Sequence, residues 1–251
     1  SLYIETKDYK ILFDVGASGL FYENAKKMGV NIYDVDFLVI SHGHYDHGGG
    51  LKVFLRENNI ADVFLHPQAF EKYYARRPNN KLEYIGLDED LKQNRRMKFT
   101  SDYFSVSDRI QIYSNVIQKE PQPLSNSGLF IEKNGQIVDD TFVHEQNLII
   151  EENGASLLIT GCAHNGIINI IEHFYTLKGY MPDYVTGGFH LSSRSGDDES
   201  LETIDKIGRY LMGTKAKYYT CHCTGIEPYN RLKALMGDNV EYLSAGSEIV
   251  I

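Results

Sequence analysis

The sequence contains no long apolar stretch. Nowhere in its 251 residues does a run approach the ~20 apolar residues of a membrane-spanning helix. The first residues, SLYIETKDYK, also lack the basic head and the apolar middle of a signal peptide. We therefore expect no membrane partner. These residues read as part of a strand, which leaves open whether another strand precedes them.

Cysteine is rare, and basic residues are fewer than acidic ones. The three cysteines are an odd number, and Cys221 and Cys223 are separated by one residue. This excludes a disulfide framework and favours a reducing cytosol, so we expect a cytoplasmic protein. The net charge of −9 argues against a nucleic-acid partner. Two short basic clusters, Arg76 with Arg77 and residues 95–98, are interpreted as solvated surface.

Two widespread catalytic signatures are missing. The chain has neither the G-x-S-x-G elbow of serine hydrolases nor the G-x-x-x-x-G-K-[ST] loop that binds nucleotide phosphates. It also has no internal repeat and no low-complexity tract. Any chemistry must therefore come from other side chains.

The chain does contain a regular alternation of strand and helix patterns. This alternation predicts an α/β fold, in a single domain over residues 1–251. The predicted helices cover 21–28, 51–55, 167–174, 201–211 and 228–236. The predicted strands cover 11–15, 35–40, 62–65, 147–151, 156–160, 184–186, 218–221, 240–243 and 248–251.

The middle of the chain, residues 67–127, has weaker periodicity. A helix is expected after Pro67 and through Arg77, and strands are expected near Tyr84 and over 110–113. A long irregular segment in a compact domain often serves as a lid or a binding loop. We therefore predict a lid or substrate-loop insertion at 67–127.

The densest cluster of potential metal ligands is SHGHYDHGGG, residues 41–50, directly after a predicted buried strand. His42 and His44 are two residues apart, so in an extended segment both imidazoles lie on one face and can reach one ion. Asp46 and His47 follow past the turn, where they can point at a second ion. Zinc accepts imidazole and carboxylate ligands together. The pattern fits a binuclear metal site, with a one-metal site as the alternative.

This motif resembles the signature of the metallo-β-lactamase superfamily, and the resemblance covers nearly the whole chain. LFDVG is similar to the early strand of that family that ends in an aspartate, here Asp14. TGCAHNG, GGFHL and TCHCTG resemble the dihydropterin–ribofuranosylaminobenzene-phosphate synthase-like branch of metal-dependent hydrolases. The resemblance implies a four-layered αββα sandwich with the metals at one sheet edge.

The resemblance also implies metal-binding positions later in the chain. His222 of TCHCTG matches the late histidine ligand. His164 of TGCAHNG is expected to be the middle ligand because it stands at a strand-to-helix turn, and His144 is the alternative. Cys162 stands where the family's bridging carboxylate would align, and it is either a thiolate ligand or a small buried residue. Asp14 is expected to orient the histidine loop rather than to bind metal directly.

The substrate is expected to meet residues near GGFHL. His190 is interpreted as a proton donor, a substrate contact or an extra ligand, and Asp46 joins it as a catalytic residue. A structural hydrogen bond is the competing interpretation of His190. Arg194 is expected to bind an anionic group of a small-molecule substrate. A solvated loop explains Arg194 equally well.

These residues predict a hydrolase. A divalent metal lowers the pKa of its bound water, and the resulting hydroxide attacks an ester, a lactone or a phosphate ester. One or two transition metals are expected, zinc first, with iron and manganese as alternatives. Two other functions compete: a metal-dependent synthase that condenses a pterin with a ribofuranosylaminobenzene phosphate, and a non-hydrolytic di-iron redox protein. The sequence does not reveal the substrate or the oligomeric state.

Overall fold

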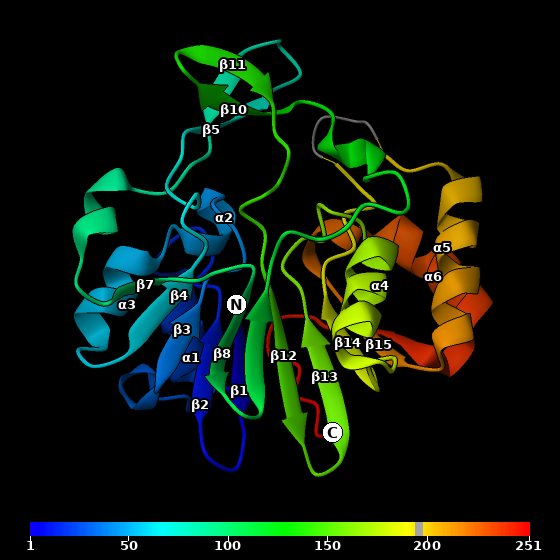
Figure 1. The fold of residues 1–251 in the computed structure, drawn as a ribbon, viewed down its shortest axis with the longest axis horizontal. Helices are drawn as coiled ribbons and strands as arrows, with labels where there is room; N and C mark the ends of the chain where they lie inside the picture. The colour runs from blue at the N-terminus through cyan, green and yellow to red at the C-terminus, as the bar shows by residue number, and fades with distance from the viewer. Residues whose placement is uncertain (194–197) are drawn as a thin grey trace.

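Two β-sheets form the centre of the molecule in this computed structural model, which describes residues 1–193 and 198–251 (Figure 1). The first sheet contains β1 (Leu2–Glu5), β2 (Lys10–Phe13), β3 (Phe37–Val39), β4 (Asp62–Leu65) and β7 (Met97–Phe99), side by side in that order. The second contains β8 (Tyr103–Ser107), β9 (Ile110–Tyr113), β12 (Asn147–Glu152), β13 (Ala155–Ile159), β14 (Tyr184–Gly187), β15 (Lys217–Thr220) and β16 (Val240–Tyr242). Its strand order is β16-β15-β14-β13-β12-β9-β8.

The alternation of side chains along the strands explains how the sheets pack. In β2, Ile11 and Phe13 lie in the core between the two sheets, together with Ile112 and Ile159 of the second sheet. Leu12, between them in the sequence, belongs to the core on the other face of the first sheet. Successive side chains of a strand point to opposite faces. Strand β2 is therefore buried on both faces, which is why its sequence is a continuous apolar run.

Helices cover the outer face of each sheet. The residues of α1 (Leu20–Lys27) and α3 (Leu51–Glu57) pack on the first sheet, and those of α4 (Ile167–Lys178), α5 (Leu201–Thr214) and α6 (Ile226–Met236) pack on the second. Helix α2 (Tyr45–Gly48) is a single turn, and short 3-10 helices occupy Ile32–Asp34, Glu89–Gln93, Leu124–Asn126, His222–Thr224 and Gly237–Asn239. Figure 1 shows the layers from α1 and α3 on the left to α4, α5 and α6 on the right. The predicted αββα sandwich is confirmed.

A third sheet lies apart from the sandwich, at the top of Figure 1. It contains β5 (Tyr73–Arg76), β6 (Leu82–Tyr84), β10 (Leu129–Lys133) and β11 (Gln136–Asp139), in the order β11-β10-β5-β6. The helix predicted through Arg77 is therefore wrong. Tyr73 and Ala75 are buried whereas Arg76 is exposed, which is the period of a strand, and Ala75 pairs with the distant Leu129.

The small sheet accounts for only part of the predicted insertion at 67–127. Strands β5 and β6 come from this segment, but β7 completes the first main sheet and β8 and β9 complete the second. The other half of the small sheet, β10 and β11, lies beyond residue 127. The predicted insertion is thus too broad, and the role of the small sheet as a lid stays a prediction.

One predicted strand, at 248–251, is absent. No strand follows β16 in the described part of the chain, and Val250 is 92% exposed, because no neighbouring strand is there to pair with it. The other predicted strands agree with the structure to within a few residues. Within residues 1–193 and 198–251, no helix has the length and apolar character that crossing a bilayer requires.

The parallel strands end at one edge of the sandwich. Strands β2 and β3 run parallel, as do β13, β14 and β15. The loops that leave β3, β13, β14 and β15 carry His42, Cys162, His190 and His222. Strand β12 runs antiparallel to β13, so His144, just before it, reaches the same edge from the opposite direction. The fold thereby gathers side chains that are far apart in the sequence.

Candidate metal centre

Potential ligands from both halves of the sandwich meet at this edge. The structure brings together all the described residues that the sequence suggested for the site: Asp14, His42, His44, Asp46, His47, His144, Cys162, His164, His190 and His222. All are buried except Asp46, which is half-buried, and His222, whose side chain is 42% exposed. Arg194 lies outside the described residues.

Asp14 anchors the histidine loop. Its Oδ1 accepts a hydrogen bond from the backbone N–H of Ser41 at 2.7 Å, and its Oδ2 accepts one from the Ser41 hydroxyl at 2.7 Å. The same Oδ2 lies 2.6 Å from Nδ1 of His47. A carboxylate only accepts, so Nδ1 of His47 carries the hydrogen. Asp14 thus orients the loop through contacts to its first residue and to one imidazole.

Ser41 fixes the tautomer of His42. The serine Oγ lies 2.8 Å from Nδ1 of His42 and already donates its single hydrogen to Asp14. The imidazole must therefore donate from Nδ1, which leaves a lone pair on Nε2. That Nε2 is buried and has no hydrogen-bond partner in the part of the chain that the structure describes. His42 is therefore held with the lone pair of Nε2 available to a ligand such as a metal ion.

The tautomer of His164 is fixed in the same way as that of His42. Its Nδ1 lies 2.8 Å from Oδ1 of Asn126, whose Nδ2 donates to the backbone oxygen of His164 at 2.8 Å. The Asn126 oxygen is therefore the acceptor, so Nδ1 of His164 donates and Nε2 keeps its lone pair. This Nε2 is also buried, and no residue within 1–193 and 198–251 forms a hydrogen bond with it.

His144 differs because both of its ring nitrogens are used. Its Nδ1 accepts a hydrogen bond from the backbone N–H of Gly43 at 2.8 Å, and its Nε2 lies 3.0 Å from the Asp140 carboxylate. The ring lies against Tyr73, with centroids 4.1 Å apart. The geometry therefore favours His164 over His144 as the middle ligand.

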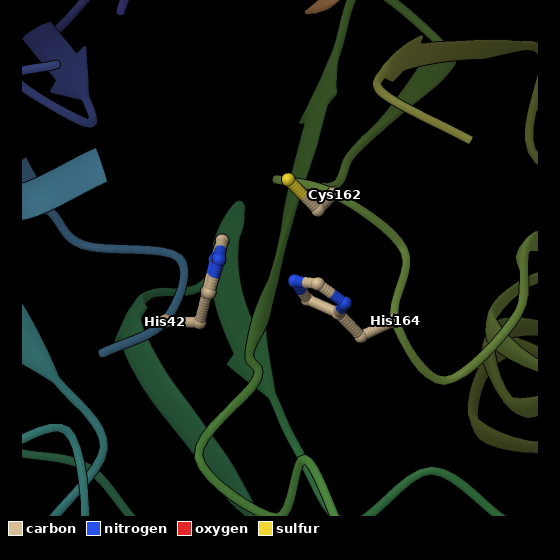
Figure 2. A group of neighbouring side chains, drawn as sticks. All are labelled: His42, Cys162 and His164. Atoms are coloured by element: carbon tan, nitrogen blue, oxygen red, sulfur yellow. The ribbon is translucent and has the colours of Figure 1, made fainter. Parts of the chain in front are cut away.

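A first group of ligand atoms comes from His42, Cys162 and His164, and these atoms lie within 4.8 Å of one another. Figure 2 shows the two imidazoles facing each other across a gap, with the thiol at one end of it. The ring of His44 packs beside this group, with its centroid 4.6 Å from that of His42 and 5.0 Å from that of His164, while its ligand atom lies within 4.8 Å of those of Asp140 and His144. Its Nε2 has no hydrogen-bond partner among the described residues, and the Asp140 carboxylate lies 3.8 Å from it.

A second group comes from His47, Cys162 and His222, with the same spacing limit of 4.8 Å. Nε2 of His47 lies 3.1 Å from the sulfur of Cys162. Asp46 adjoins the group, since its Oδ2 is 3.3 Å from Nε2 of His222 and 3.8 Å from Nε2 of His47. Cys162 is common to both groups, at the position where the family resemblance implies a carboxylate.

Burial and neighbouring charges determine the protonation of these candidate ligands. Burial, reinforced by nearby imidazoles, lowers the pKa of His42 and of His164 well below the ordinary value, so both rings are neutral. Burial also lowers the pKa of His47, but Asp14 and Asp46 outweigh it and raise the value to about 9. A metal that binds His47 must therefore displace a proton.

Several residues of the site have a left-handed backbone. Asp14, Ala163, His190 and His222 have φ angles of 60°, 57°, 50° and 53°. Residues with a Cβ adopt this region rarely, at a cost of about 1–3 kcal/mol each, and such residues cluster at functional sites. Here they occur where the chain leaves a strand and turns its side chain toward the edge.

Four residues that support the site were missed by the sequence analysis: Asn126, Asp140, Glu145 and Cys223. Glu145 is fully buried, and it accepts hydrogen bonds from the backbone N–H groups of His164 at 2.7 Å and Asn165 at 2.9 Å. It thereby fixes the turn that presents His164. The sulfur of Cys223 lies within 4.8 Å of ligand atoms of Cys162 and His190.

Two of these residues had a signal in the sequence. Glu145 and Cys223 stand directly beside motif histidines, in FVHEQ and TCHCTG. Asn126 and Asp140 lie in segments without a recognisable pattern, and only the fold places them against His164 and His144.

The donor set fits a divalent transition metal. The Nε2 atoms of His42, His44 and His164 are buried without a hydrogen-bond partner among the described residues. Burying such an atom costs free energy, because the atom loses its hydrogen bonds to water and gains no hydrogen bond within the protein. Imidazole nitrogen, thiolate sulfur and carboxylate oxygen are the donors that zinc and similar metals accept. A bound cation would satisfy these atoms.

The comparisons with known proteins agree with this geometry. The chain is 29% identical to the 7,8-dihydropterin-6-methyl-4-(beta-D-ribofuranosyl)-aminobenzene-5'-phosphate synthase of Methanocaldococcus jannaschii, over 96% of this chain and 84% of that protein. It is 31% identical to an uncharacterised protein of the same organism, over 100% of this chain and 92% of the relative.

A solved structure and a family model complete the comparison. The crystal structure of Tm1679, described as a metal-dependent hydrolase of the beta-lactamase superfamily, superposes with a TM-score of 0.80 at 28% identity, over 96% of this chain and 88% of that one. The family model for the metallo-beta-lactamase superfamily matches residues 1–210. The chain therefore belongs to the metallo-β-lactamase superfamily, as its motifs predicted.

Proposed function

We propose that this protein is a metal-dependent hydrolase that cleaves an ester, lactone or phosphate-ester bond of a small molecule. One observation carries the proposal: the buried Nε2 atoms of His42 and His164, which have no hydrogen-bond partner among the described residues, gather beside the thiol of Cys162, with the ring of His44 packed against both imidazoles. Membership of the superfamily supports it, since the similar protein Tm1679 is described as a metal-dependent hydrolase.

The ligands divide into two sets that share one residue. We assign the first set to His42, His44 and His164, the second to Asp46, His47 and His222, and Cys162 to the position between them. A divalent transition metal, with zinc the first candidate, supplies at such a site a Lewis acid and brings the pKa of bound water near neutral.

Two side chains are placed to move protons. Neither ring nitrogen of His190 has a hydrogen-bond partner among the described residues, and its ring centroid is 4.1 Å from that of His164. Asp46 and His190 both line the cavity that opens over the site. In this account His190 donates a proton to the leaving oxygen, and Asp46 accepts one from the attacking water.

One observation favours a second candidate function. The relative that is 29% identical to this chain is named as a synthase, and the match covers 96% of the chain. A synthase of that kind would join a pterin to a ribofuranosylaminobenzene phosphate, and it would use the same edge of the sandwich. The two candidates differ in whether a bond is cleaved by water or formed between two substrates.

A panel of reactions separates these candidates. The purified protein is analysed for metals and assayed on esters, lactones and phosphodiesters, and in parallel on the pterin condensation. The hydrolase proposal predicts turnover of at least one of the first three classes, lost on chelation and restored by metal. Condensation without any hydrolysis would establish the synthase instead. Full activity in a chelated, metal-free protein would refute both.

A further inference from the structure

Two thiols lie next to each other at the metal-binding edge. Cys162 follows β13 and Cys223 follows β15, so the fold brings together two residues that are 61 positions apart. The thiol of Cys223 donates to the backbone oxygen of Cys162 at 3.5 Å, and the two Sγ atoms lie within 4.8 Å of each other. Both cysteines are free. The pair is therefore close enough for small side-chain rotations to bring the sulfurs together.

A glycine makes room for this contact. Gly188, in the motif GGFHL, lies beside both cysteines. A Cβ placed on this glycine would be 2.5 Å from Sγ of Cys223 and 3.5 Å from Cα of Cys162. The first distance is too short for any real Cβ, so a side chain at this position would displace the Cys223 thiol. The backbone of this motif thus permits the close approach of the two cysteines.

The same cavity gives access to both thiols. It has a volume of about 270 Å³, and Cys162 and Cys223 are among the residues that line it. Cys162 is 3% exposed, whereas Cys223 is half-buried. Hydrogen peroxide is little larger than a water molecule, which takes about 30 Å³ in the liquid, so it can enter. The third cysteine, Cys221, is not among the described residues that line this cavity.

We propose that Cys162 and Cys223 are an oxidation site, at which hydrogen peroxide converts the two thiols into one disulfide bond. Cys223, the more accessible sulfur, attacks one peroxide oxygen; the O–O bond breaks, a water molecule leaves, and a sulfenic acid forms. The sulfur of Cys162 then attacks the sulfur of Cys223; the S–O bond breaks, the S–S bond forms, and a second water molecule leaves. Peroxide takes up two electrons from the pair, and the two thiol protons end in the water. A thiol reductant reverses the reaction.

The disulfide changes the metal centre, because Cys162 belongs to both groups of candidate ligand atoms. The thiolate is the form of cysteine that binds a metal, and a sulfur in a disulfide is no longer a thiolate. Oxidation therefore weakens metal binding. This consequence rests on the proposed function, because it uses the metal positions assigned there. In a reducing cytosol a bond of this kind is transient, which agrees with the absence of a disulfide framework.

Peroxide treatment of three proteins tests the proposal: the wild type, Cys223→Ser and Cys221→Ser. Cys221 is a matched control, since its thiol is only two residues from Cys223 and lies outside the described lining of the cavity. The full chain is chelated, reduced, freed of reductant and treated with hydrogen peroxide. Free thiols are then alkylated, and tryptic peptides are analysed by mass spectrometry without reduction. The wild type and Cys221→Ser should give peptides 134–178 and 218–231 linked by one disulfide, and Cys223→Ser should not.

Other results would overturn the proposal. A link that persists in Cys223→Ser but disappears in Cys221→Ser would assign the bond to Cys221. Oxidation of single thiols to sulfinic acid without any link would mean that the two sulfurs cannot meet. Unmodified thiols, at a peroxide concentration that oxidises free glutathione, would mean that peroxide does not react there. Fragmentation between residues 221 and 223 locates the link in the wild type itself, so the test does not depend on how a variant folds.

Zinc titration keeps this proposal separate from the proposed hydrolase. Zinc should bind the oxidised wild type at least about tenfold more weakly than the reduced protein. Equal zinc affinity in both states would refute the effect on the metal centre. If the disulfide forms but neither state binds zinc, the hydrolase proposal fails and the oxidation site stands. If zinc binds and hydrolysis is found, but no link forms between Cys162 and Cys223, only the oxidation site fails.

Discussion

His47 and Cys162 are 115 positions apart in the sequence, yet Nε2 of one lies 3.1 Å from Sγ of the other. One residue comes from the motif after β3 and the other from the loop after β13, so this contact joins the two halves of the sandwich. It also joins the two groups of ligand atoms, because Cys162 belongs to both. The thiol thus lies where one side chain can serve two metals.

Cys162 should therefore matter for metal binding more than a small buried residue would. Cys162→Ala should lower metal affinity by more than the roughly 10- to 100-fold that loss of an outer partner costs. Cys162→Asp, which restores a carboxylate at this position, should retain more metal than the alanine variant. Isothermal titration with zinc checks both. Unchanged affinity in Cys162→Ala would make the thiol a packing residue only.

The middle ligand can be tested by a paired substitution. His164→Ala should lose metal, because it removes an unpaired Nε2 beside His42. His144→Ala should keep metal but lower the free energy of unfolding by about 1–3 kcal/mol, since it leaves the buried Asp140 and Gly43 without their partner. Elemental analysis and urea unfolding distinguish the two. Metal loss in His144→Ala alone would reverse the assignment.

His190 should act on the reaction rather than on metal binding. His190→Ala should lower kcat by roughly 100-fold or more, as expected for the loss of a proton donor, with metal content unchanged. Steady-state kinetics on the best substrate of the panel, beside elemental analysis, gives the answer. If metal is lost together with activity, His190 is a ligand, which its closeness to Cys162 and Cys223 would allow.

His66 should make stability depend on pH. Burial lowers its pKa to about 4 in the folded protein, against about 6.5 for the unperturbed side chain. The unfolded chain therefore takes up a proton as the pH falls through 6.5, while the folded chain does not until about pH 4. The resulting stability is complete above pH 6.5 and is lost between 6.5 and 4, by at most about 3 kcal/mol.

A substitution isolates this effect from the other buried groups. Nδ1 of His66 accepts a hydrogen bond from the backbone N–H of Gln68 at 3.1 Å, which an asparagine oxygen can also accept. Urea unfolding of the chelated protein at pH 7 and pH 4.5 should show a smaller loss of stability in His66→Asn than in the wild type, by about 2 kcal/mol. Parallel losses in both proteins would show that His66 does not contribute.

Much of the sandwich could be predicted because its strands carry their own signal. Strand β3 is a short apolar run directly before SHGHYDHGGG, so the sequence alone predicts both the strand and the candidate ligands that follow it. The small sheet could not be predicted in this way. Strand β5 is defined by its pairing with the distant β10, and Tyr73–Arg76 has too few residues to show the alternation of buried and exposed side chains that marks a strand. Similarly, the weak periodicity of residues 67–127 predicts one insertion, although the later strands of this segment complete the two main sheets.

The choice between His164 and His144 shows where sequence reasoning ends. Both histidines stand near motif positions, and both are buried at the same edge. What separates them is the partner of each ring nitrogen: Asn126 takes only Nδ1 of His164, whereas Gly43 and Asp140 take both nitrogens of His144. These partners come from other loops, and no sequence pattern near His164 or His144 indicates them.

The central claim is that His42 and His164 hold a divalent metal beside Cys162. A crystal structure of the protein purified without chelator, with anomalous diffraction at the zinc, iron and manganese edges, tests it most directly. The account predicts an anomalous peak about 2.0–2.1 Å from Nε2 of His42 and of His164, the distance of a zinc–imidazole bond. A well-ordered site without any such peak, or with the peak beside His144 instead of His164, would contradict it.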